Sequence, residues 1–297
     1  MQPFANHGLG IGGYDTGLRE SIRGWLAEDI GTGDITTRTT IPAGSAMKAV
    51  IHAKEEGIIA GLPVAETVFA VVDPSLVFTA LVQDGDMVSI GTIIAEIEGS
   101  THSILTGERL ALNLMQRLSG IATKTRQFVD ALEGLPVRLV DTRKTTPGHR
   151  LLEKYAVRVG GGANHRFGLY DAVMIKDNHI KGAGGITAAV SAARSAIPHT
   201  MKIEVETESL EQVGEALNSG ADIIMLDNMK PELMREAVAI IRSRAPHVVT
   251  EASGGVTLET VRSMAESGVD IISVGGLTYS FRSLDISLDL GGKKGRA

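Results

Sequence analysis

Six short apolar runs in the second half of the chain are each followed by charged, polar or glycine residues. The runs cover 137–140, 172–175, 203–205, 223–226, 248–250 and 271–274. The residues at or just beyond their ends include Asp141, Lys176, Glu206, Asp227, Ser253 and Gly275. In a βα barrel the functional groups lie where each strand ends and its loop begins. Six such ends predict a ring of ligand-facing groups around one mouth.

One half of this ring is basic. Its residues are Arg143, Lys144, His165, Arg166 and Lys176. A guanidinium binds a carboxylate or a phosphate through two parallel hydrogen bonds, whereas a lysine acts as a point charge. Residues 141–181 hold eight Lys/Arg and four Asp/Glu, which gives +4 and leaves −10 for the rest of a chain whose net charge is −6. An acidic protein with one basic segment indicates a small anionic ligand and argues against nucleic acid.

The other half of the ring consists of carboxylates and glycines. Glu206 and Asp227 offer hard oxygen ligands, which suit Mg²⁺ or the hydroxyls of a ribose. Glu204 and Glu206 alternate along one strand and face the same side, and Glu206 is favoured because it lies nearer the carboxyl end of that strand. The glycine pairs 254–255 and 275–276 expose backbone N–H groups, as the loops after the last two barrel strands often do for a phosphate.

Each of these positions also has an ordinary structural interpretation. A charged residue after a strand is usually a solvated loop residue, and Gly254 and Gly255 could form a turn. Asp227 could cap a helix that begins near Pro231. Because all six strand ends carry charged, polar or glycine residues, the functional interpretation is favoured over six independent coincidences.

The spacing of the apolar runs predicts the elements that position these groups. Strands that begin at about 202, 222, 247 and 271 repeat every 20 to 25 residues, which is the spacing of βα units. Six strands do not demonstrate a complete eightfold barrel. In the first half, helices at 16–28 and 63–72 and strands at 47–54 and 92–97 predict a small α+β unit, and a long helix follows at 106–132.

The composition is that of an ordinary globular enzyme. Hydrophobic residues make up 43% of the 297 and charged residues 22%, enough for one large domain and a smaller one. The chain has no run of 18 apolar residues, which predicts no membrane span, and Met1–Gly17 has no signal-peptide pattern. The lack of cysteine excludes disulfides and thiolate metal sites. Together these features favour the cytoplasm.

Several stretches of the chain match a known family. They are 28–36, 108–113, 141–148, 160–166, 176–179, 226–228 and 252–255. The most specific are Asp-Thr-Arg-Lys-Thr-Thr-Pro at 141–147 and Gly-Gly-Ala-Asn-His-Arg at 161–166. On these residues the chain resembles the quinolinate phosphoribosyltransferases, also called nicotinate-nucleotide pyrophosphorylases (carboxylating), from about Ser21 to Leu284.

The resemblance implies a fold and an assembly. It implies an α/β protein with an N-terminal α/β sandwich over 16–115 and an open α/β barrel of about seven strands over 116–279. A flexible terminus at 1–15 and a segment at 280–297 that returns to the N-terminal domain complete the expected organisation. The expected assembly is a homodimer, or a hexamer built from it, in which Arg109 crosses to the neighbouring site. No nucleic acid or membrane partner is expected.

The resemblance also implies an activity. The chain is expected to transfer the phosphoribosyl group of phosphoribosyl pyrophosphate to quinolinate with decarboxylation. The products are nicotinate mononucleotide, CO₂ and pyrophosphate, in de novo NAD biosynthesis. The expected cofactor is Mg²⁺, held indirectly through Glu206 and Asp227, with no organic cofactor.

Residue roles follow from the same resemblance. The quinolinate-binding residues are expected to be Arg109, Arg143, His165, Arg166 and Lys176. The residues that bind phosphoribosyl pyrophosphate are expected to be Thr142, Lys144, Glu206, Asp227, Ser253, Gly254, Gly255 and Gly275. Lys144, Glu206 and Asp227 are the expected catalytic residues. The chain departs from the family at Tyr279, where a histidine is frequent, and this puts one phosphate-side contact in doubt.

Two alternatives stay open at this point. An enzyme of the same architecture could take nicotinate in place of quinolinate, although one carboxylate does not need several arginines. A noncatalytic anion-binding or assembly protein is the other alternative, because the hairpin from Asp84 to Thr92 resembles those of biotin and lipoyl carriers. That hairpin has no lysine to modify at its turn.

Overall fold

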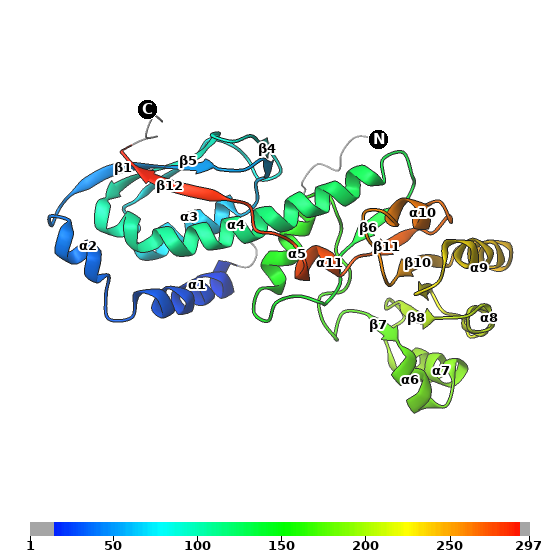
Figure 1. The fold of residues 1–297 in the computed structure, drawn as a ribbon. Helices are drawn as coiled ribbons and strands as arrows, with labels where there is room; N and C mark the ends of the chain where they lie inside the picture. Colours follow the sequence, from blue (N-terminus) through cyan, green and yellow to red (C-terminus); the bar gives the residue numbers. More distant parts are fainter. Residues whose placement is uncertain (1–14, 292–297) are drawn as a thin grey trace. The chain divides into compact units, whose positions relative to one another are not determined.

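A computed structural model describes residues 15–291, and these form two compact units (Figure 1). Of the described residues, 15–123 and 282–291 form the first unit, and Lys124–Phe281 form the second. The expected flexible segment at 1–15 lies, except for Asp15, outside the described residues.

The first unit is built on an antiparallel sheet with the strand order β12-β1-β5-β3. The strands are β1 (Ala46–Ala53), β3 (Val77–Ala80), β5 (Ile93–Ser100) and β12 (Ile286–Leu290). The short strands β2 (Gly57–Ile58) and β4 (Met87–Val88) pair separately. β12 comes from the end of the chain, and its Leu290 pairs with Ala49 of β1. The last strand therefore completes a sheet whose first strand lies near the start of the chain.

Among residues 15–291, three helices belong to the first unit alone. They are α1 (Asp15–Ile30), α2 (Ile35–Thr40) and α3 (Leu62–Val72). The backbone N–H groups at the start of α3, those of Gly61 and Leu62, donate to the Asp84 carboxylate at 2.8 and 3.0 Å. A carboxylate at a helix N-terminus satisfies donors that the helix itself leaves open. The turn at Asp84, which resembled a carrier hairpin in sequence, thus has a structural role.

The helix α4 (Thr101–Ala131) spans 31 residues, and the division between the two units falls within it, after Thr123. Its buried residues in the first unit include Ala111, Leu112 and Met115. The Ser119 hydroxyl receives a hydrogen bond from the Ala60 amide at 3.0 Å. Helical spacing in the sequence predicted this element from residue 106 onward, whereas the structure begins it at Thr101.

The second unit contains a parallel sheet with the order β6-β11-β10-β9-β8-β7. Its strands are β6 (Arg138–Val140), β7 (Val173–Ile175), β8 (Ile203–Thr207), β9 (Ile223–Asp227), β10 (Val249–Ser253) and β11 (Ile271–Ser273). The described residues form these six parallel strands, and an isolated parallel bridge joins Val140 to Ala163 beyond β6. The α/β barrel class is confirmed.

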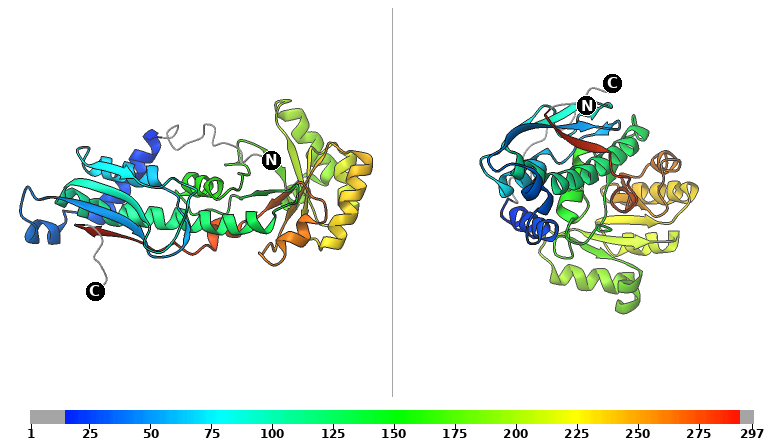
Figure 2. Two further views of the ribbon diagram at one scale, coloured as in Figure 1. Left: turned by 90° about the horizontal axis from the view of Figure 1, so that it is seen from above. Right: turned by 60° about the vertical axis from the view of Figure 1, so that its left-hand side comes forward.

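Helices follow the strands. They are α5 (Arg150–Val159), α6 (Asp177–Ala183), α7 (Ile186–Ala196), α8 (Leu210–Asn218), α9 (Pro231–Arg244), α10 (Val261–Ala265) and α11 (Gly276–Tyr279). Those from α7 to α9, coloured yellow-green to gold, cover the outer side of the sheet (Figure 2). Because all six strands run in the same direction, their carboxyl ends meet at one edge. The charged and glycine-rich segments that follow the strands therefore share one mouth, as the sequence predicted.

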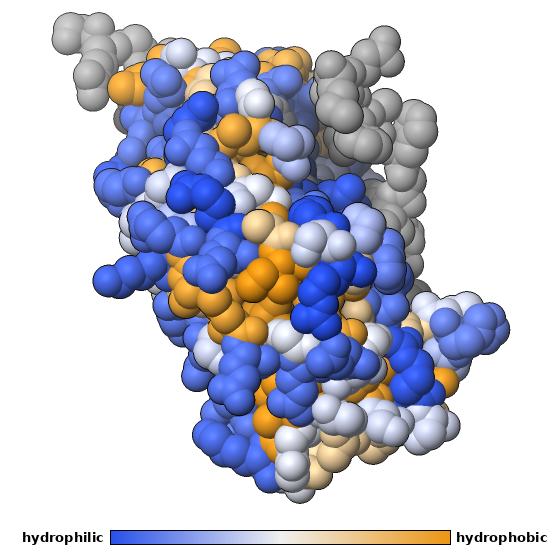
Figure 3. Space-filling model, turned by 90° about the vertical axis from the view of Figure 1, so that its right-hand side faces the viewer, coloured by the Kyte–Doolittle hydropathy of each residue, from blue (hydrophilic) through white to orange (hydrophobic). Residues whose placement is uncertain are grey.

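One face of the molecule is mostly polar. Hydrophilic residues cover most of the face in Figure 3, and apolar residues gather in smaller patches near its middle. Within residues 15–291, none of the helices is both long and apolar enough to cross a membrane.

Candidate active site

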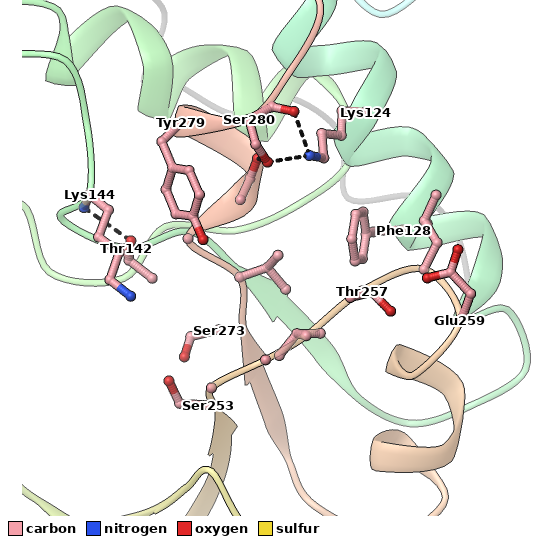
Figure 4. Close-up of a pocket in the computed structure, with 17 residues that line it drawn as sticks. Lys124, Phe128, Thr142, Lys144, Ser253, Thr257, Glu259, Ser273, Tyr279 and Ser280 are labelled. Carbon is pink, nitrogen blue, oxygen red and sulfur yellow. Dashed lines mark hydrogen bonds between the residues drawn. The ribbon is translucent and has the colours of Figure 1, made fainter.

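A pocket opens at the carboxyl ends of β10 and β11 in the second unit (Figure 4). The segment from Ser253 to Gly255 lines one wall, and the segment from Ser273 to Gly276 lines another. Thr142 and Lys144, which follow β6, complete the mouth. The sequence-predicted phosphate segments thus lie around one cavity.

The space around residue 254 leaves no room for a side chain, so the position requires glycine. Its φ is +89°, and a Cβ there would lie 2.2 Å from the Oδ1 atom of Asn228 and 2.9 Å from its backbone nitrogen. Asn228 itself has a φ of +54° and donates its backbone N–H to the Ser253 carbonyl at 2.9 Å. The ends of β9 and β10 are packed so closely that a side chain at 254 would force them apart.

We expect Gly254→Ala to lower kcat/KM for the phosphate-bearing substrate by about tenfold, the equivalent of one lost charge-assisted hydrogen bond. Steady-state kinetics with that substrate varied would measure the effect. Gly220→Ala is the matched control, because Gly220 has a φ of +77° at the amino end of β9 and no other atom would lie within 4 Å of a Cβ at that position. If both variants lost kcat/KM equally, the loss would come from strain at a positive φ and not from the contact with Asn228.

A cation on α4 joins the pocket. The Lys124 ammonium donates to the Ser280 carbonyl at 2.9 Å and to its hydroxyl at 2.8 Å. Burial lowers the pKa of Lys124. Tyr279 is 63% exposed, and its ring lies against Gly275 at the pocket edge. Lys124 was not predicted as a site residue, because nothing in a regular helical pattern distinguishes a lysine that faces a pocket from a solvated one.

Two guanidinium groups, those of Arg143 and Arg166, lie close enough to interact and are not among the residues that line this pocket. Arg166 donates to the Ala172 carbonyl at 3.1 Å and contacts the Met174 sulfur at 3.5 Å. Burial, and then the charge of Arg143, lowers the pKa of Arg166. The Nε atom of Arg143 is buried and has no hydrogen-bond partner among the described residues. Two neighbouring like charges with a free donor form a site that an anion would stabilise.

The predicted carboxylates end two adjacent strands. Glu206 of β8 receives a hydrogen bond from the Lys176 ammonium at 3.0 Å, and its side chain is 13% exposed. Asp227 at the end of β9 receives one from the Asn228 side chain at 2.6 Å. The structure thus places Glu206 and Asp227 on neighbouring strands at the mouth.

His165 lies between two buried carboxylates, those of Glu204 on β8 and Glu251 on β10, which come before the carboxyl ends of their strands. Its Nε2 atom is 3.3 Å from Glu204 Oε2 and 3.6 Å from Glu251 Oε2. Burial lowers the pKa of His165, but the hydrogen bond to Glu204 and the charge of Glu251 outweigh it, so its pKa lies above the ordinary value. Burial, and then the charge of Glu204, raises the pKa of Glu251 to about 7. Glu204 and Glu251 therefore form one electrostatic unit with His165.

Glu251 makes stability depend on pH. Its pKa is about 7 in the folded protein against 4.5 for the ordinary group, so unfolding releases a proton between these values. The contribution of Glu251 to the free energy of unfolding is therefore fully present below pH 4.5, and it falls by about 3 kcal/mol as the pH rises through 7. We expect Glu251→Gln to remove this fall, measured by urea unfolding at pH 5 and pH 8. The control is Glu236→Gln at an exposed position, in which the free energy of unfolding should still fall with pH. If it fell equally in Glu251→Gln, Glu251 would not be the group responsible.

A buried ion pair holds the loop that carries His165. The Lys154 ammonium donates to the Asp141 carboxylate and, at 3.0 Å, to the His165 carbonyl. Asp141 also accepts from the His165 amide at 2.9 Å and from the Asn164 side chain at 2.6 Å. Both charged side chains are fully buried. This network joins β6, α5 and the loop after α5, and it fixes the start of the basic segment.

Arg109 is the one predicted residue outside the second unit. It lies on α4 in the first unit, and its side chain is exposed. The other predicted residues all lie between Thr142 and Gly275. The crossing of Arg109 to a neighbouring site stays a prediction.

A parallel α/β barrel whose mouth combines a glycine cradle with clustered cations has the features of the barrel enzymes that bind phosphate-bearing substrates at the carboxyl ends of their strands. The family model for the quinolinate phosphoribosyl transferase C-terminal domain matches residues 121–289, and that for the N-terminal domain matches residues 34–119. The chain belongs to the quinolinate phosphoribosyltransferase family.

Individual relatives support the assignment to this family. A probable nicotinate-nucleotide pyrophosphorylase (carboxylating) of Bacillus subtilis is 48% identical over 92% of this chain and 93% of its own length. One from Synechocystis is 52% identical over 80% of each chain. The solved nicotinate-nucleotide pyrophosphorylase of Francisella tularensis superposes with a TM-score of 0.88 at 40% identity, covering 93% of this chain and 96% of that one.

Proposed function

We propose that the chain transfers the phosphoribosyl group of phosphoribosyl pyrophosphate to quinolinate, with decarboxylation, to form nicotinate mononucleotide, CO₂ and pyrophosphate. The observation that carries this proposal is the proximity of Arg143 and Arg166 to each other, together with the glycine cradle of the pocket at the ends of β10 and β11. Two guanidinium groups suit the two carboxylates of quinolinate, and the cradle suits a 5-phosphate. The relatives named for this reaction support it.

We assign the binding of quinolinate to the basic side of the mouth. These residues are Arg143, His165, Arg166 and Lys176, together with Arg109 of the partner subunit. The homodimer, and a hexamer built from it, are part of the proposal. Thr142, Lys144, Ser253, Gly254, Gly255 and Gly275 would bind phosphoribosyl pyrophosphate. The cytoplasmic location also stays a prediction, since some plant relatives are named as chloroplastic or mitochondrial proteins.

Mg²⁺ is the proposed cofactor. The carboxylates of Glu206 and Asp227 end adjacent strands and offer the hard oxygens that Mg²⁺ accepts. Because Glu206 is already paired with Lys176, we infer that contact to the ion runs partly through substrate oxygens and water. When bound, Mg²⁺ would neutralise charge on the pyrophosphate.

The chemistry follows from charge placement. The quinolinate nitrogen attacks ribose C1 and pyrophosphate leaves with the bonding pair, while Glu206 and Asp227 stabilise the positive charge that develops on the ribose. The Arg and Lys side chains hold two anions that would otherwise repel each other, which is a proximity effect. The resulting pyridinium accepts electron density as the C2 carboxylate leaves as CO₂. A proton from solvent then replaces it at C2.

A product assay tests the proposal. Quinolinate, phosphoribosyl pyrophosphate and Mg²⁺ are incubated with the protein, and nicotinate replaces quinolinate in a parallel tube. Nicotinate mononucleotide and CO₂ formed only from quinolinate are the expected result. If folded protein forms no product from quinolinate, the proposal fails, and Tyr279 is the first residue to examine.

A further inference from the structure

Two buried carboxylates beside the proposed quinolinate site have no part in the mechanism above. Glu204 lies on β8 and Glu251 on β10, with β9 between them. Their side chains are 4% and 2% exposed, and the Oε2 atom of each points at the same ring nitrogen of His165. The Oε1 atom of Glu204 is buried and accepts no hydrogen bond from the described residues, and the Ser273 hydroxyl lies near the Glu251 carboxylate. Placing two anions beside an anion-binding site is costly, so a role beyond packing is needed to explain them.

The three residues match the donor set of a metal site, since one atom from each lies within 4.8 Å of the others. The hydrogen bonds of His165 argue against that use. Its Nδ1 atom accepts the backbone N–H of Arg166 at 2.7 Å, so Nδ1 carries no hydrogen. A neutral imidazole then carries its hydrogen on Nε2, where it can donate to a carboxylate but cannot bind a metal.

The same hydrogen bonds fix His165 in place between the two carboxylates and Arg166. Its backbone amide and carbonyl are held by Asp141 and Lys154, and its ring is held at Nε2 by the carboxylates. Through Nδ1 the ring holds the amide of Arg166, whose guanidinium reaches the carbonyl of Ala172. Rotation of the imidazole would break its hydrogen bond to the Arg166 amide. The backbone position from which the Arg166 side chain extends would then change.

We propose that Glu204 and Glu251 are positioning residues, which orient His165 and through it Arg166 for the binding of quinolinate. This inference rests on the proposed function. Glu204 is the stronger partner because its oxygen lies closer to Nε2. The carboxylates act as hydrogen-bond acceptors, and their charge is not the property that the site requires.

Glu204→Leu and Glu204→Gln separate these properties. Leucine removes the acceptor, whereas glutamine keeps an acceptor oxygen and removes the charge. We expect Glu204→Leu to raise KM for quinolinate about tenfold, the equivalent of one hydrogen bond to a charged group, with KM for phosphoribosyl pyrophosphate changed less than about twofold. Glu204→Gln should leave KM for quinolinate at or below the wild-type value, because it removes a negative charge near a dianion. Glu236→Leu on the outer helix α9 is the control.

A spectroscopic measurement reports the hydrogen bonding of the His165 ring directly. In ¹⁵N-histidine-labelled protein, with His165 assigned from a His165→Gln variant and the pH set above the raised pKa of His165 so that the ring is neutral, we expect Nδ1 to be unprotonated and Nε2 protonated. Glu204→Gln should keep this tautomer and Glu204→Leu should lose it. If Glu204→Leu fails to fold, Glu251→Leu and the tautomer of Glu204→Gln serve in its place.

Several results would overturn the inference. They are an Nδ1-protonated His165 in the wild type, equal rises in both KM values for Glu204→Leu, and a stoichiometric metal ion lost on Glu204→Gln. Wild-type protein that makes no product from quinolinate would overturn the proposed function instead. Active wild-type protein with an unaffected Glu204→Leu variant would overturn only the positioning role.

Discussion

Replacing Arg143 with alanine is expected to lower kcat/KM for quinolinate by about 100- to 1000-fold, the largest kinetic effect that we predict. Arg143 presents a buried Nε donor without a partner among the described residues, and its charge acts directly on Arg166. Loss of a bidentate guanidinium–carboxylate contact removes two charge-assisted hydrogen bonds, and the lower end of their usual range, about 1.5 kcal/mol each, already gives about 150-fold. Arg143→Lys should recover only part of this loss, because an ammonium keeps the charge without the planar fork.

The measurement is steady-state kinetics with each substrate varied in turn. KM for phosphoribosyl pyrophosphate should change far less than kcat/KM for quinolinate. Arg235→Ala, at an exposed position on α9, provides a control that should behave like the wild type. If Arg143→Ala and Arg166→Ala impaired the use of nicotinate and of quinolinate alike, the dicarboxylate interpretation would be contradicted.

The strand ends show why so much of the mouth was predictable from the sequence. Parallel strands bring their carboxyl ends to one edge regardless of detail, so the groups after each apolar run had to converge. The alternation of Glu204 and Glu206 was also informative. Glu206, nearer the end of β8, lies at the mouth and pairs with Lys176, whereas Glu204 is buried deeper beside His165.

The parts that could not be predicted depend on pairings between distant residues. Lys154 counted as one more cation of the basic segment, yet its ammonium is fully buried against Asp141. Asp141 ends a strand as a ligand-facing group would, but its oxygens accept hydrogen bonds from the loop at 164–165. No local periodicity reveals which charges pair, because Lys154 on α5 meets Asp141, just after β6, only in the folded chain.

The Lys154–Asp141 pair leads to the largest stability effect that we predict. We expect Lys154→Met to lower the free energy of unfolding by about 3 to 5 kcal/mol, because Asp141 would remain buried and charged without a counter-ion. Burial raises the pKa of Asp141 and lowers that of Lys154, and their attraction offsets only part of this cost. Urea unfolding at neutral pH, compared with the exposed control Lys202→Met, would measure the loss.

The double variant Asp141→Asn/Lys154→Met tests whether the pair stabilises the fold or positions the loop. Each single change leaves one buried charge, whereas the double change leaves none, so its cost should be well below the sum of the two. The asparagine side chain would still accept the His165 amide, but the bond that Lys154 makes to the His165 carbonyl would be lost. We therefore expect recovered stability with a KM for quinolinate that stays raised. Additive losses of stability would contradict the coupling, and recovery of both properties would mean that the ion pair does not position the loop.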